Sequence, residues 1–456
     1  MTISAVILAA GKGTRMKSTR AKVLHKLAGK PLLQHVVDTA EMLAPRNITV
    51  IYGHDGEAVQ SGIEGDTLCW IEQKDQKGTG HAVAQALPNI KADEKVLILY
   101  GDVPLISKAS LDELIALCPE QGVSLLTIKL PNPSGYGRII RNQENQVIGI
   151  VEQKDANAEQ LLIDEINTGI FCVTGSLLQR WLPSLENNNA QGEYYLTDII
   201  ALAAKEDVPV FACHPESAEE VEGINNRRQL AHLERAYQLN VANELMDAGV
   251  TLSDPTRLDV RGNVSIASDV EIDINVIFEG TVEVATGVVI GPNCVLKNCS
   301  LGEGVVIKAN TVIEDAVIEK DCVIGPFARI RPKTVLAEGV KIGNFVETKK
   351  SNIGKGSKVS HLSYIGDAEI GENANIGAGT ITCNYDGVNK FKTEIGDGAF
   401  IGSNTCLIAP VKVGVNATTG AGSAINKDVA DNQLSIARGK QRNIESWKRP
   451  QKIKQD

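Results

Sequence analysis

The segment Leu8–Met16, with the sequence LAAGKGTRM, carries residue types that suit phosphate binding. Gly11 and Gly13 let the backbone approach phosphate oxygens closely, and Lys12 and Arg15 add positive charge. Thr-Arg follows the second glycine, so the segment is neither a Walker loop nor a GxGxxG dinucleotide loop. A GxG pair alone fits a plain turn equally well.

A carboxylate follows a second apolar run. Residues 96–100 are continuously apolar, and Gly101-Asp102 comes directly after them. A buried strand would bring Asp102 to the edge of a sheet where ligands bind. Carboxylate oxygens combined with phosphate oxygens suit Mg²⁺. A single aspartate after a strand also fits a turn or a helix cap.

The second half of the chain contains one histidine, His361. Imidazole titrates in the range that makes it a suitable general base. His361 follows a cationic insert, Thr348–Ser351, and lies near a shortened step between the aliphatic residues Ile365 and Ile370. A lone histidine also commonly has only a structural role.

The elements that must position these groups differ between the two halves of the chain. In the first half, apolar runs at Ile3–Leu8, Ile48–Tyr52, Val96–Tyr100 and Val123–Lys129 alternate with amphipathic segments. This alternation predicts an α/β domain with a mostly parallel sheet, whose ligands bind at the carboxyl ends of the strands. Apolar residues at a spacing of three to four then predict a connecting helix over Arg227–Ala248, before Gly249.

The second half repeats every six residues. Branched aliphatic residues recur at this spacing, often followed by glycine, and the fifth place of the hexad is usually small. This period is the signature of a parallel β-helix, in which three hexads form one coil and on the order of ten coils stack. Periodicity alone does not give the hand of the coil. Two runs show the register: Val260, Ile266, Ile272, Phe278, Val284 and Ile290, and then Ile395, Ile401, Leu407, Val413, Thr419 and Ile425.

Composition narrows the functional classes. A chain of 456 residues predicts two or three domains. The net charge of -10 argues against general nucleic-acid binding, although the segment 438–454 is basic. Nine cysteines without a CxxC pair indicate neither zinc nor a disulfide framework, and they favour a reducing compartment. No signal peptide or membrane-length apolar run is present, so we expect a cytoplasmic protein without membrane insertion.

Three motifs together resemble the sugar-1-phosphate nucleotidyltransferases: LAAGKGTRM followed by Lys22, GTGHA at Gly78–Ala82, and LYGDVPL at Leu99–Leu105. With the hexad half attached, the whole chain resembles the bacterial bifunctional N-acetylglucosamine-1-phosphate uridyltransferase/glucosamine-1-phosphate N-acetyltransferases. Ala21 departs from the pattern, because the family often has proline before the lysine. Without proline the backbone before Lys22 is less fixed.

The resemblance implies a fold, domains and a pathway. The fold class is α/β, with an N-terminal Rossmann-like nucleotide-diphospho-sugar transferase domain, a connecting helix and a C-terminal left-handed parallel β-helix of hexapeptide repeats. The expected domains are residues 1–227 for uridyl transfer, 228–248 for the helical linker, and 249–456 for acetyl transfer, including a basic C-terminal tail. Acetylation of glucosamine 1-phosphate would precede uridyl transfer, supplying precursors of peptidoglycan and lipopolysaccharide. The family also implies a homotrimer with acetyl sites between subunits.

For uridyl transfer the resemblance implies UTP as the uridyl donor, Mg²⁺ held by Asp102 and Asn225, and catalytic cations Arg15 and Lys22. The sugar phosphate is already anionic at pH 7, so the protein must align it and neutralise charge. The residues implied to bind UTP or the UDP-sugar are Leu8, Ala9, Ala10, Gly11, Lys22, Gln73, Gly78, Thr79, Tyr100, Gly101, Asp102, Gly137, Glu152, Asn167 and Asn225.

For acetyl transfer the resemblance implies acetyl-CoA as the donor and His361 as the general base. Glucosamine 1-phosphate would contact four residues, namely Arg331, Lys349, Tyr364 and Asn375. The residues implied to contact acetyl-CoA are Ala378, Asn384, Tyr385, Ser403, Ala421 and Arg438.

Three alternatives remain to be weighed against this interpretation. The first is a sugar-1-phosphate nucleotidyltransferase with one activity, whose β-helix only oligomerises or regulates it. The second is a metal enzyme similar to the γ-class carbonic anhydrases, which need three histidines where this half has one. The third is a non-enzymatic scaffold, for which LAAGKGTRM and Gly101-Asp102 would have no use. Pyrophosphate release and thiol release, measured side by side, distinguish them.

Overall fold

The computed structural model of the protein describes residues 2–53, 55–65 and 68–452. The chain divides into two compact units at Gln238/Leu239. Among the residues that the structure describes, no helix combines the length and apolar character needed to cross a lipid bilayer.

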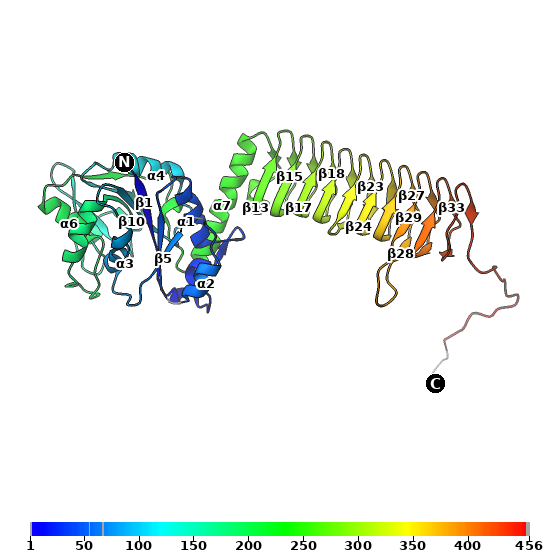
Figure 1. The fold of residues 1–456 in the computed structure, drawn as a ribbon, viewed down its shortest axis with the longest axis horizontal. Coiled ribbons are helices and arrows are strands. Elements are labelled where there is room, and N and C mark those ends of the chain that lie inside the picture. The colour runs from blue at the N-terminus through cyan, green and yellow to red at the C-terminus, as the bar shows by residue number, and fades with distance from the viewer. Residues whose placement is uncertain (1, 54, 66–67, 453–456) are drawn as a thin grey trace. The chain divides into compact units, whose positions relative to one another are not determined.

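Unit 1 is built around a nine-stranded sheet (Figure 1). Its main path runs β11-β7-β10-β6-β1-β4-β5, with β8 paired to β10 and β9 paired to β8. The strands β5, β4, β1 and β6 are parallel, and β10 runs antiparallel to both β6 and β7. The sheet is therefore mixed, with a parallel central part as expected. Its strands are β1 (Ile3–Ala9), β4 (Ile48–Tyr52), β5 (Leu68–Glu72), β6 (Lys95–Tyr100), β7 (Val123–Lys129), β8 (Arg138–Arg141), β9 (Val147–Val151), β10 (Glu165–Thr174) and β11 (Val210–Cys213).

Helices cover both faces of this sheet because its central strands are apolar on both sides. Ala5 and Ile7 of β1 pack with α1 and α4, whereas Val6 and Leu8 pack with α3, α5 and α6. The alternation follows from the two-residue period of a strand. The helices are α1 (Leu32–Glu41), α2 (Gly56–Ser61), α3 (Thr79–Gln85), α4 (Lys108–Leu117), α5 (Gly175–Trp181) and α6 (Asp198–Lys205).

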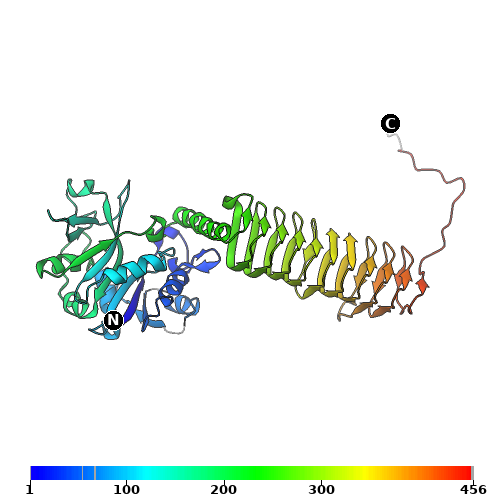
Figure 2. The same ribbon diagram turned by 90° about the horizontal axis from the view of Figure 1, so that it is seen from above.

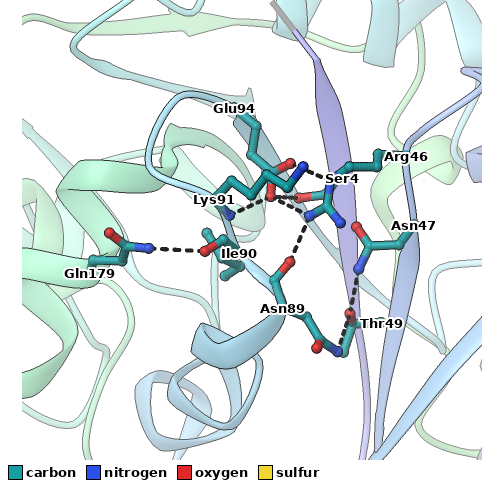
Figure 3. A network of polar contacts seen from close by, with 9 residues as sticks. All are labelled: Ser4, Arg46, Asn47, Thr49, Asn89, Ile90, Lys91, Glu94 and Gln179. Carbon is teal, nitrogen blue, oxygen red and sulfur yellow. Dashed lines mark hydrogen bonds and ion pairs between the residues drawn. The ribbon is translucent and has the colours of Figure 1, made fainter.

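A buried ion pair ties the amino-terminal ends of the central strands together (Figure 3). Glu94, which is 1% exposed, accepts hydrogen bonds from Ser4 Oγ (2.9 Å), Arg46 Nε (2.9 Å) and the backbone N–H of Lys91 (2.8 Å). Burial alone would raise the pKa of Glu94, but the hydrogen bonds from Arg46, Lys91 and Ser4 outweigh it and lower the pKa. This network lies at the edge of the sheet opposite to the carboxyl ends of β1 and β6.

The helix α7 (Arg227–Asp247) ends one residue before the bound expected from the spacing. Within unit 1, Leu233 belongs to an apolar cluster that includes Leu27. Within unit 2, Ala242 and Leu245 join the apolar core of the repeats.

Unit 2 is a three-sided parallel β-helix, in agreement with the six-residue period (Figure 2). Its first face is an eleven-stranded parallel sheet, and the other two faces share a thirteen-stranded sheet. Ile272 pairs with Ile290, and Ile290 with Ile307, so successive coils take 18 and then 17 residues. The parallel sheets and the repeat pattern are consistent with the expected left-handed β-helix.

The strands of unit 2 fall into two sets. The first face contains β12 (Thr251–Leu252), β14 (Glu271–Ile272), β16 (Val289–Ile290), β18 (Val306–Ile307), β20 (Val323–Ile324), β23 (Lys341–Asn344), β25 (Lys358–His361), β27 (Asn375–Ile376), β30 (Phe400–Ile401), β33 (Thr418–Thr419) and β35 (Leu434–Ser435). The other faces contain β13 (Leu258–Ile266), β15 (Val276–Val284), β17 (Val295–Leu301), β19 (Val312–Ile318), β21 (Arg329–Ile330), β22 (Thr334–Leu336), β24 (Glu347–Ile353), β26 (Tyr364–Ile370), β28 (Ile381–Cys383), β29 (Thr393–Ile395), β31 (Cys406–Ile408), β32 (Val411–Val413) and β34 (Ala424–Ile425).

The shortened step beside His361 is an ordinary corner of the coil. The five-residue step from Ile365 to Ile370 recurs in the strands Val295–Leu301 and Val312–Ile318, between the buried residues of the second and third faces. A residue with positive φ, such as Asp367 (φ 49°), makes the tight turn. The shortened step is therefore common to several coils and does not single out His361. The break after Cys383 is a loop between β28 and β29 (Figure 1).

Candidate functional site

In unit 1, a cavity of about 360 Å³ opens at the carboxyl ends of β1 and β6. This is the edge at which parallel sheets bind ligands. The cavity brings together segments that are far apart in the sequence. Its lining residues are Leu8, Ala9, Ala10, Gly11, Lys22, Val23, Gln73, Gln76, Gly78, Thr79, Ala82, Tyr100, Asp102 and Glu193.

One side of the cavity presents the amide of Gln73, which is 4% exposed. Its Nε2 donates to the carbonyl of Gly78 (3.2 Å) and lies 3.0 Å from His81 Nδ1. Gly78 has φ 111°, and a Cβ there would lie 2.5 Å from the carbonyl oxygen of Tyr194, so the position requires glycine. Thr79 Oγ1 accepts from the backbone N–H of Leu196 (3.1 Å). The amide is thus held in place to pair with a polar heterocycle.

Around Lys22 the site gathers positive charge and side-chain oxygens. Lys22 Nζ donates to Asp102 Oδ2 and to Asn225 Oδ1, the latter at 3.2 Å. Arg15 donates to the same Asn225 oxygen at 2.9 Å. Since one ammonium reaches both oxygens, Asp102 and Asn225 converge on a single point. A carboxylate and an amide oxygen are hard donors, so this pair fits Mg²⁺.

The backbone places Lys22 by a close contact. Gly13 has φ 60°, and a Cβ at Gly13 would lie 2.6 Å from Cβ of Lys22. Ala21 has φ -52° and ψ 138°, within the range that proline imposes. The chain therefore adopts the conformation expected of proline without having proline at this position.

Beyond Tyr100 lies a second group of expected residues. A Cβ on Gly137 would lie 3.3 Å from Glu152 Oε1, and the backbone N–H of Asn167 donates to the Gly137 carbonyl (2.9 Å). Burial raises the pKa of Glu152, against a hydrogen bond from Thr197 that lowers it. The pKa of Tyr100 is also raised, first by burial and then by the charges of Glu152 and Asp102. Both acidic groups are therefore close enough to Tyr100 for their charges to act on it.

In unit 2, His361 ends β25 at the edge where the first face turns into the second. Its Nδ1 lies 3.0 Å from Oδ1 of Asn344, one coil earlier. Backbone hydrogen bonds continue up this edge, from Gly379 to His361 (3.2 Å), from Asn404 to Ala378 (2.7 Å), and from Gly422 to Ser403 (2.7 Å). At the next coil, Arg438 Nη1 donates to the Ala421 carbonyl (2.7 Å). One edge thus aligns His361 with Ala378, Ser403, Ala421 and Arg438.

The second face carries a cluster of charge. Arg331 Nη1 donates to Glu347 Oε1 at 2.6 Å, and Glu347 pairs with Tyr364 in the next coil. Lys349 stands beside this pair, and the charges of Lys390 and Arg331 lower the pKa of Lys349. Lys390 and Arg331 thus disfavour the charge of Lys349, and such a group of cations suits a bound phosphate.

The loop between β28 and β29 begins at Asn384, whose Nδ2 donates to Asp367 Oδ2 at 2.6 Å. Lys350 pairs with the same aspartate at 3.1 Å, so the start of the loop is tied to the coil below. Tyr385 is exposed, and its hydroxyl donates to the carbonyl of Gly387 (2.5 Å).

A single copy of unit 2 does not gather the whole expected acetyl site. Asn375 lies on the first face, in β27, whereas Tyr364 lies on the second face in β26. His361 stands exposed at the edge between these two faces. An edge of a prism is convex, whereas small-molecule sites are concave.

Several residues at these sites were not found from the sequence. In unit 1, Gln76 donates from Nε2 to the Ala10 carbonyl and lines the cavity. In unit 2, Asn344, Glu347 and Lys390 contact or face expected residues. Gln76 lies three residues after Gln73, and Asn344 lies 17 residues before His361, which is one coil. A known coil length is the signal that would have found Asn344.

Three family models match parts of the chain. Residues 5–146 match a MobA-like NTP transferase domain, residues 260–353 match a GMPPB C-terminal domain, and residues 392–427 match a hexapeptide repeat of succinyl-transferase. The first match covers most of the cavity in unit 1, and the other two cover much of the β-helix.

Curated relatives match the chain along its whole length. The "Bifunctional protein GlmU" of Idiomarina loihiensis is 58% identical over 454 residues, covering 100% of both chains. The protein of the same name from Marinobacter nauticus is 56% identical over 447 residues, covering 98% of each chain. Among solved structures, a UDP-glucose pyrophosphorylase complexed with UDP-glucose is 18% identical, with a TM-score of 0.43, covering 52% of this chain and 98% of that one.

Proposed function

The chain belongs to the family of bifunctional GlmU proteins, and we propose from this premise that unit 1 transfers uridyl groups and unit 2 transfers acetyl groups. The protein is thus a bifunctional transferase with a nucleotidyltransferase half and an acyltransferase half. The first reaction would join acetyl-CoA and glucosamine 1-phosphate to give N-acetylglucosamine 1-phosphate. The second would convert that product and UTP to UDP-N-acetylglucosamine and pyrophosphate, as supply for cell-wall precursors.

The observation that carries the uridyl proposal is the convergence of Gln73, Lys22 and Asp102 on one cavity. The oxygen of the Gln73 amide could accept a hydrogen bond from the N–H of uracil, while Nε2 donates to Gly78 and contacts His81. A phosphate oxygen of the sugar phosphate would attack the α-phosphorus of UTP, and the bond to the bridging oxygen would break to release pyrophosphate. Lys22 and Arg15 would stabilise the charge that develops in this step. Tyr100, Gly101, Gly137, Glu152 and Asn167 would hold the sugar.

We propose Mg²⁺ as the metal at Asp102 and Asn225, on the basis of their convergent oxygens. A bound Mg²⁺ would neutralise charge on the phosphates of the nucleotide. The protein's own part is to hold these oxygens at the carboxyl end of β6, next to the cations.

For acetyl transfer, the arrangement of Asn344 and His361 supports a general base. An Asn344 oxygen that accepts from Nδ1–H leaves His361 Nε2 free to take a proton from the sugar amine. The amine would then attack the thioester carbonyl, and coenzyme A would leave as the thiol. Arg331 and Lys349, together with Lys390, would bind the phosphate of the sugar, with Tyr364 and Asn375 as further contacts. Ala378, Asn384, Tyr385, Ser403, Ala421 and Arg438 would contact acetyl-CoA.

We further propose that the protein is a homotrimer whose acetyl sites form between copies. Phe327, Phe345 and Leu362 are 50%, 55% and 61% exposed on the edge that carries His361. All three have positive φ (55°, 56° and 49°), and the two phenylalanine rings stack at 5.4 Å. Bulky side chains are unfavourable in this conformation, so their presence at an exposed edge supports burial by another copy. A neighbouring copy would also supply the concave wall that the edge lacks.

We place the protein in the cytoplasm. The nine cysteines are all free thiols, and most are buried, which suits a reducing compartment. The partners that we propose are small-molecule substrates and other copies of the chain, without nucleic acid or membrane insertion.

Two assays on the full-length protein test the proposal. We expect pyrophosphate release with UTP and N-acetylglucosamine 1-phosphate, and thiol release with acetyl-CoA and glucosamine 1-phosphate. Pyrophosphate release without thiol release would instead support the single-activity nucleotidyltransferase, which the full-length similarity to bifunctional relatives does not favour.

A further inference from the structure

We propose that the ammonium group of Lys22 occupies the metal position in the metal-free protein, as an internal stand-in for the metal. Metal binding must then displace this ammonium group. Lys22 Nζ contacts Asp102 Oδ2 and lies 3.2 Å from Asn225 Oδ1. A cation held by these two oxygens would occupy the place of this nitrogen. The inference rests on the proposed function, since it takes Asp102 and Asn225 as the metal ligands.

The environment of Asp102 explains why a stand-in is needed. The side chains of Lys22 and Asp102 are only 12% and 14% exposed. A carboxylate removed from water without a partner is strongly unfavourable. The charges of Glu152 and Asp102 both act on Tyr100, so Glu152 adds to the negative charge of this region. Lys22 compensates the Asp102 charge until a metal does so.

The cavity offers the Lys22 side chain a second position once the metal has displaced it. Lys22 lines the cavity of about 360 Å³ together with Gly11 and Gln76, and its four-carbon stem can turn while its backbone stays fixed. In the cavity the released ammonium would meet the phosphates of the nucleotide. Metal entry and nucleotide entry are therefore coupled, because the nucleotide supplies Lys22 with a new anionic partner as the metal takes the old one.

Arg15 provides a matched comparison. It donates to the Asn225 oxygen at 2.9 Å, whereas Lys22 donates to the oxygens of both Asp102 and Asn225. Loss of Arg15 removes the same charge from the same cluster but leaves Lys22 on both oxygens. If loss of Lys22 raises the metal affinity more than loss of Arg15 does, the difference reflects occupancy of the metal position rather than net charge.

The test measures binding of Mn²⁺ without nucleotide, by the electron paramagnetic resonance signal of free Mn²⁺, for the wild type, Lys22→Gln and Arg15→Gln. If Lys22 occupies the position nearly all the time, Lys22→Gln tightens Mn²⁺ binding by at least about tenfold, since apparent affinity scales with the competent fraction. Arg15→Gln should tighten it much less. Equal gains for the two variants, or no gain for Lys22→Gln, would overturn the proposal.

A thermal measurement guards against misfolding. Without metal, Lys22→Gln should melt at a lower temperature than the wild type, because Asp102 has lost its partner, and Mn²⁺ should raise its melting temperature more than that of the wild type. The gain in affinity must also disappear in the double variant Lys22→Gln/Asp102→Asn. A gain that persists there places Mn²⁺ elsewhere and overturns the stand-in role. Pyrophosphate release by the wild type is measured separately, so failure of the proposed function would be recognised on its own.

Discussion

Asn344 Oδ1 lies 3.0 Å from Nδ1 of His361, across two adjacent coils of the β-helix. The two residues are paired by the parallel register of β23 and β25, 17 residues apart. An acceptor at Nδ1 favours the tautomer in which Nδ1 carries the hydrogen, and it leaves Nε2 as the basic nitrogen. Asn344 is thus a positioning residue for the expected base.

The first prediction separates the base from its positioning partner. His361→Ala should lower thiol release by a factor on the order of 10²–10⁴, the usual contribution of a general base. Asn344→Ala should lower it less and shift its pH profile, because the imidazole remains but its tautomer is no longer fixed. Initial rates of thiol release across pH check both.

Asn352→Ala serves as the control for this series. Asn352 donates to Glu369 (2.9 Å) at an exposed place on the same β-helix and should leave thiol release unchanged. Pyrophosphate release should stay unchanged in all three variants. A near-wild-type rate of thiol release in His361→Ala would show that another group acts as the base.

The second prediction concerns Asp102. Asp102→Ala removes a carboxylate from the expected metal site, so pyrophosphate release should fall below detection while thiol release survives. The control is Asp75→Ala, whose carboxylate is 71% exposed in the same unit and should leave both activities intact. Loss of both activities in folded Asp102→Ala protein would contradict the assignment of the two reactions to separate units.

The third prediction concerns association between copies. Phe327→Asn/Phe345→Asn should reduce the mass in solution, measured by light scattering, and should also reduce thiol release. Asn293 and Asn310 occupy the same corner in earlier coils, with φ 59° and 60°, so asparagine suits this conformation and the variant should fold. Phe211→Asn, at a 47% exposed site of unit 1, is the matched control and should leave the mass unchanged. An unchanged mass for the double variant would refute this interface.

The fourth prediction concerns the buried Glu94. Glu94→Gln should lower the free energy of unfolding at pH 7 by about 1.5–3 kcal/mol, because it removes charge-assisted hydrogen bonds to Arg46. The pKa of Glu94 is lowered in the folded protein, so its contribution is fully present above the unfolded value and is lost as pH falls through the folded value.

Denaturant unfolding at a series of pH values checks this prediction. The difference between the wild type and Glu94→Gln should shrink as the pH falls below about 4, where glutamate becomes protonated. Asp93→Asn, at the exposed neighbouring position, should have little effect at any pH. An equally large difference at low pH would show that the charge of Glu94 is not what stabilises the sheet.

The fifth prediction concerns Ala21. Its φ of -52° already suits proline, so Ala21→Pro should raise the free energy of unfolding of unit 1 by about 0.4–1 kcal/mol, through a less flexible unfolded chain. The same denaturant measurement applies, with pyrophosphate release as the functional readout. Destabilisation would mean that the proline ring meets a steric or hydrogen-bonding conflict at this position.

Much of the architecture could be predicted because it depends on local periodicity. The strands Ile48–Tyr52 and Val123–Lys129 have the bounds expected from their apolar runs, and the six-residue repeat corresponds to a β-helix. The position of Asp102 at the sheet edge also follows from the run that precedes it. In each case a few neighbouring residues determine the outcome.

What could not be predicted depends on register between distant residues. Most coils take 17 or 18 residues, the last takes 16 (Thr418 to Leu434), and one takes 25 (Ile376 to Ile401) because it contains the loop. The partner of His361 could therefore not be read from the hexads. Gln76 joins the cavity through a hydrogen bond to Ala10, which is 66 residues away. The pair of Arg46 and Glu94 depends on two strand ends meeting, and the sequence around each gives no sign of it.

The stacking of the coils determines the order in which parts of unit 2 unfold locally. Each coil contacts chiefly its two neighbours, so unfolding is cooperative only along the stack. The coil at an uncovered end has a neighbour on one side only and is therefore less stable. The edge from His361 to Arg438 runs toward the last coil, β35. The hydrogen-bonded amide protons of Asn404 and Gly422 should therefore exchange with solvent sooner than those of Phe345 and Leu362, through fraying from that end. A cofactor that spans Ala378 to Arg438 would stabilise these coils against fraying.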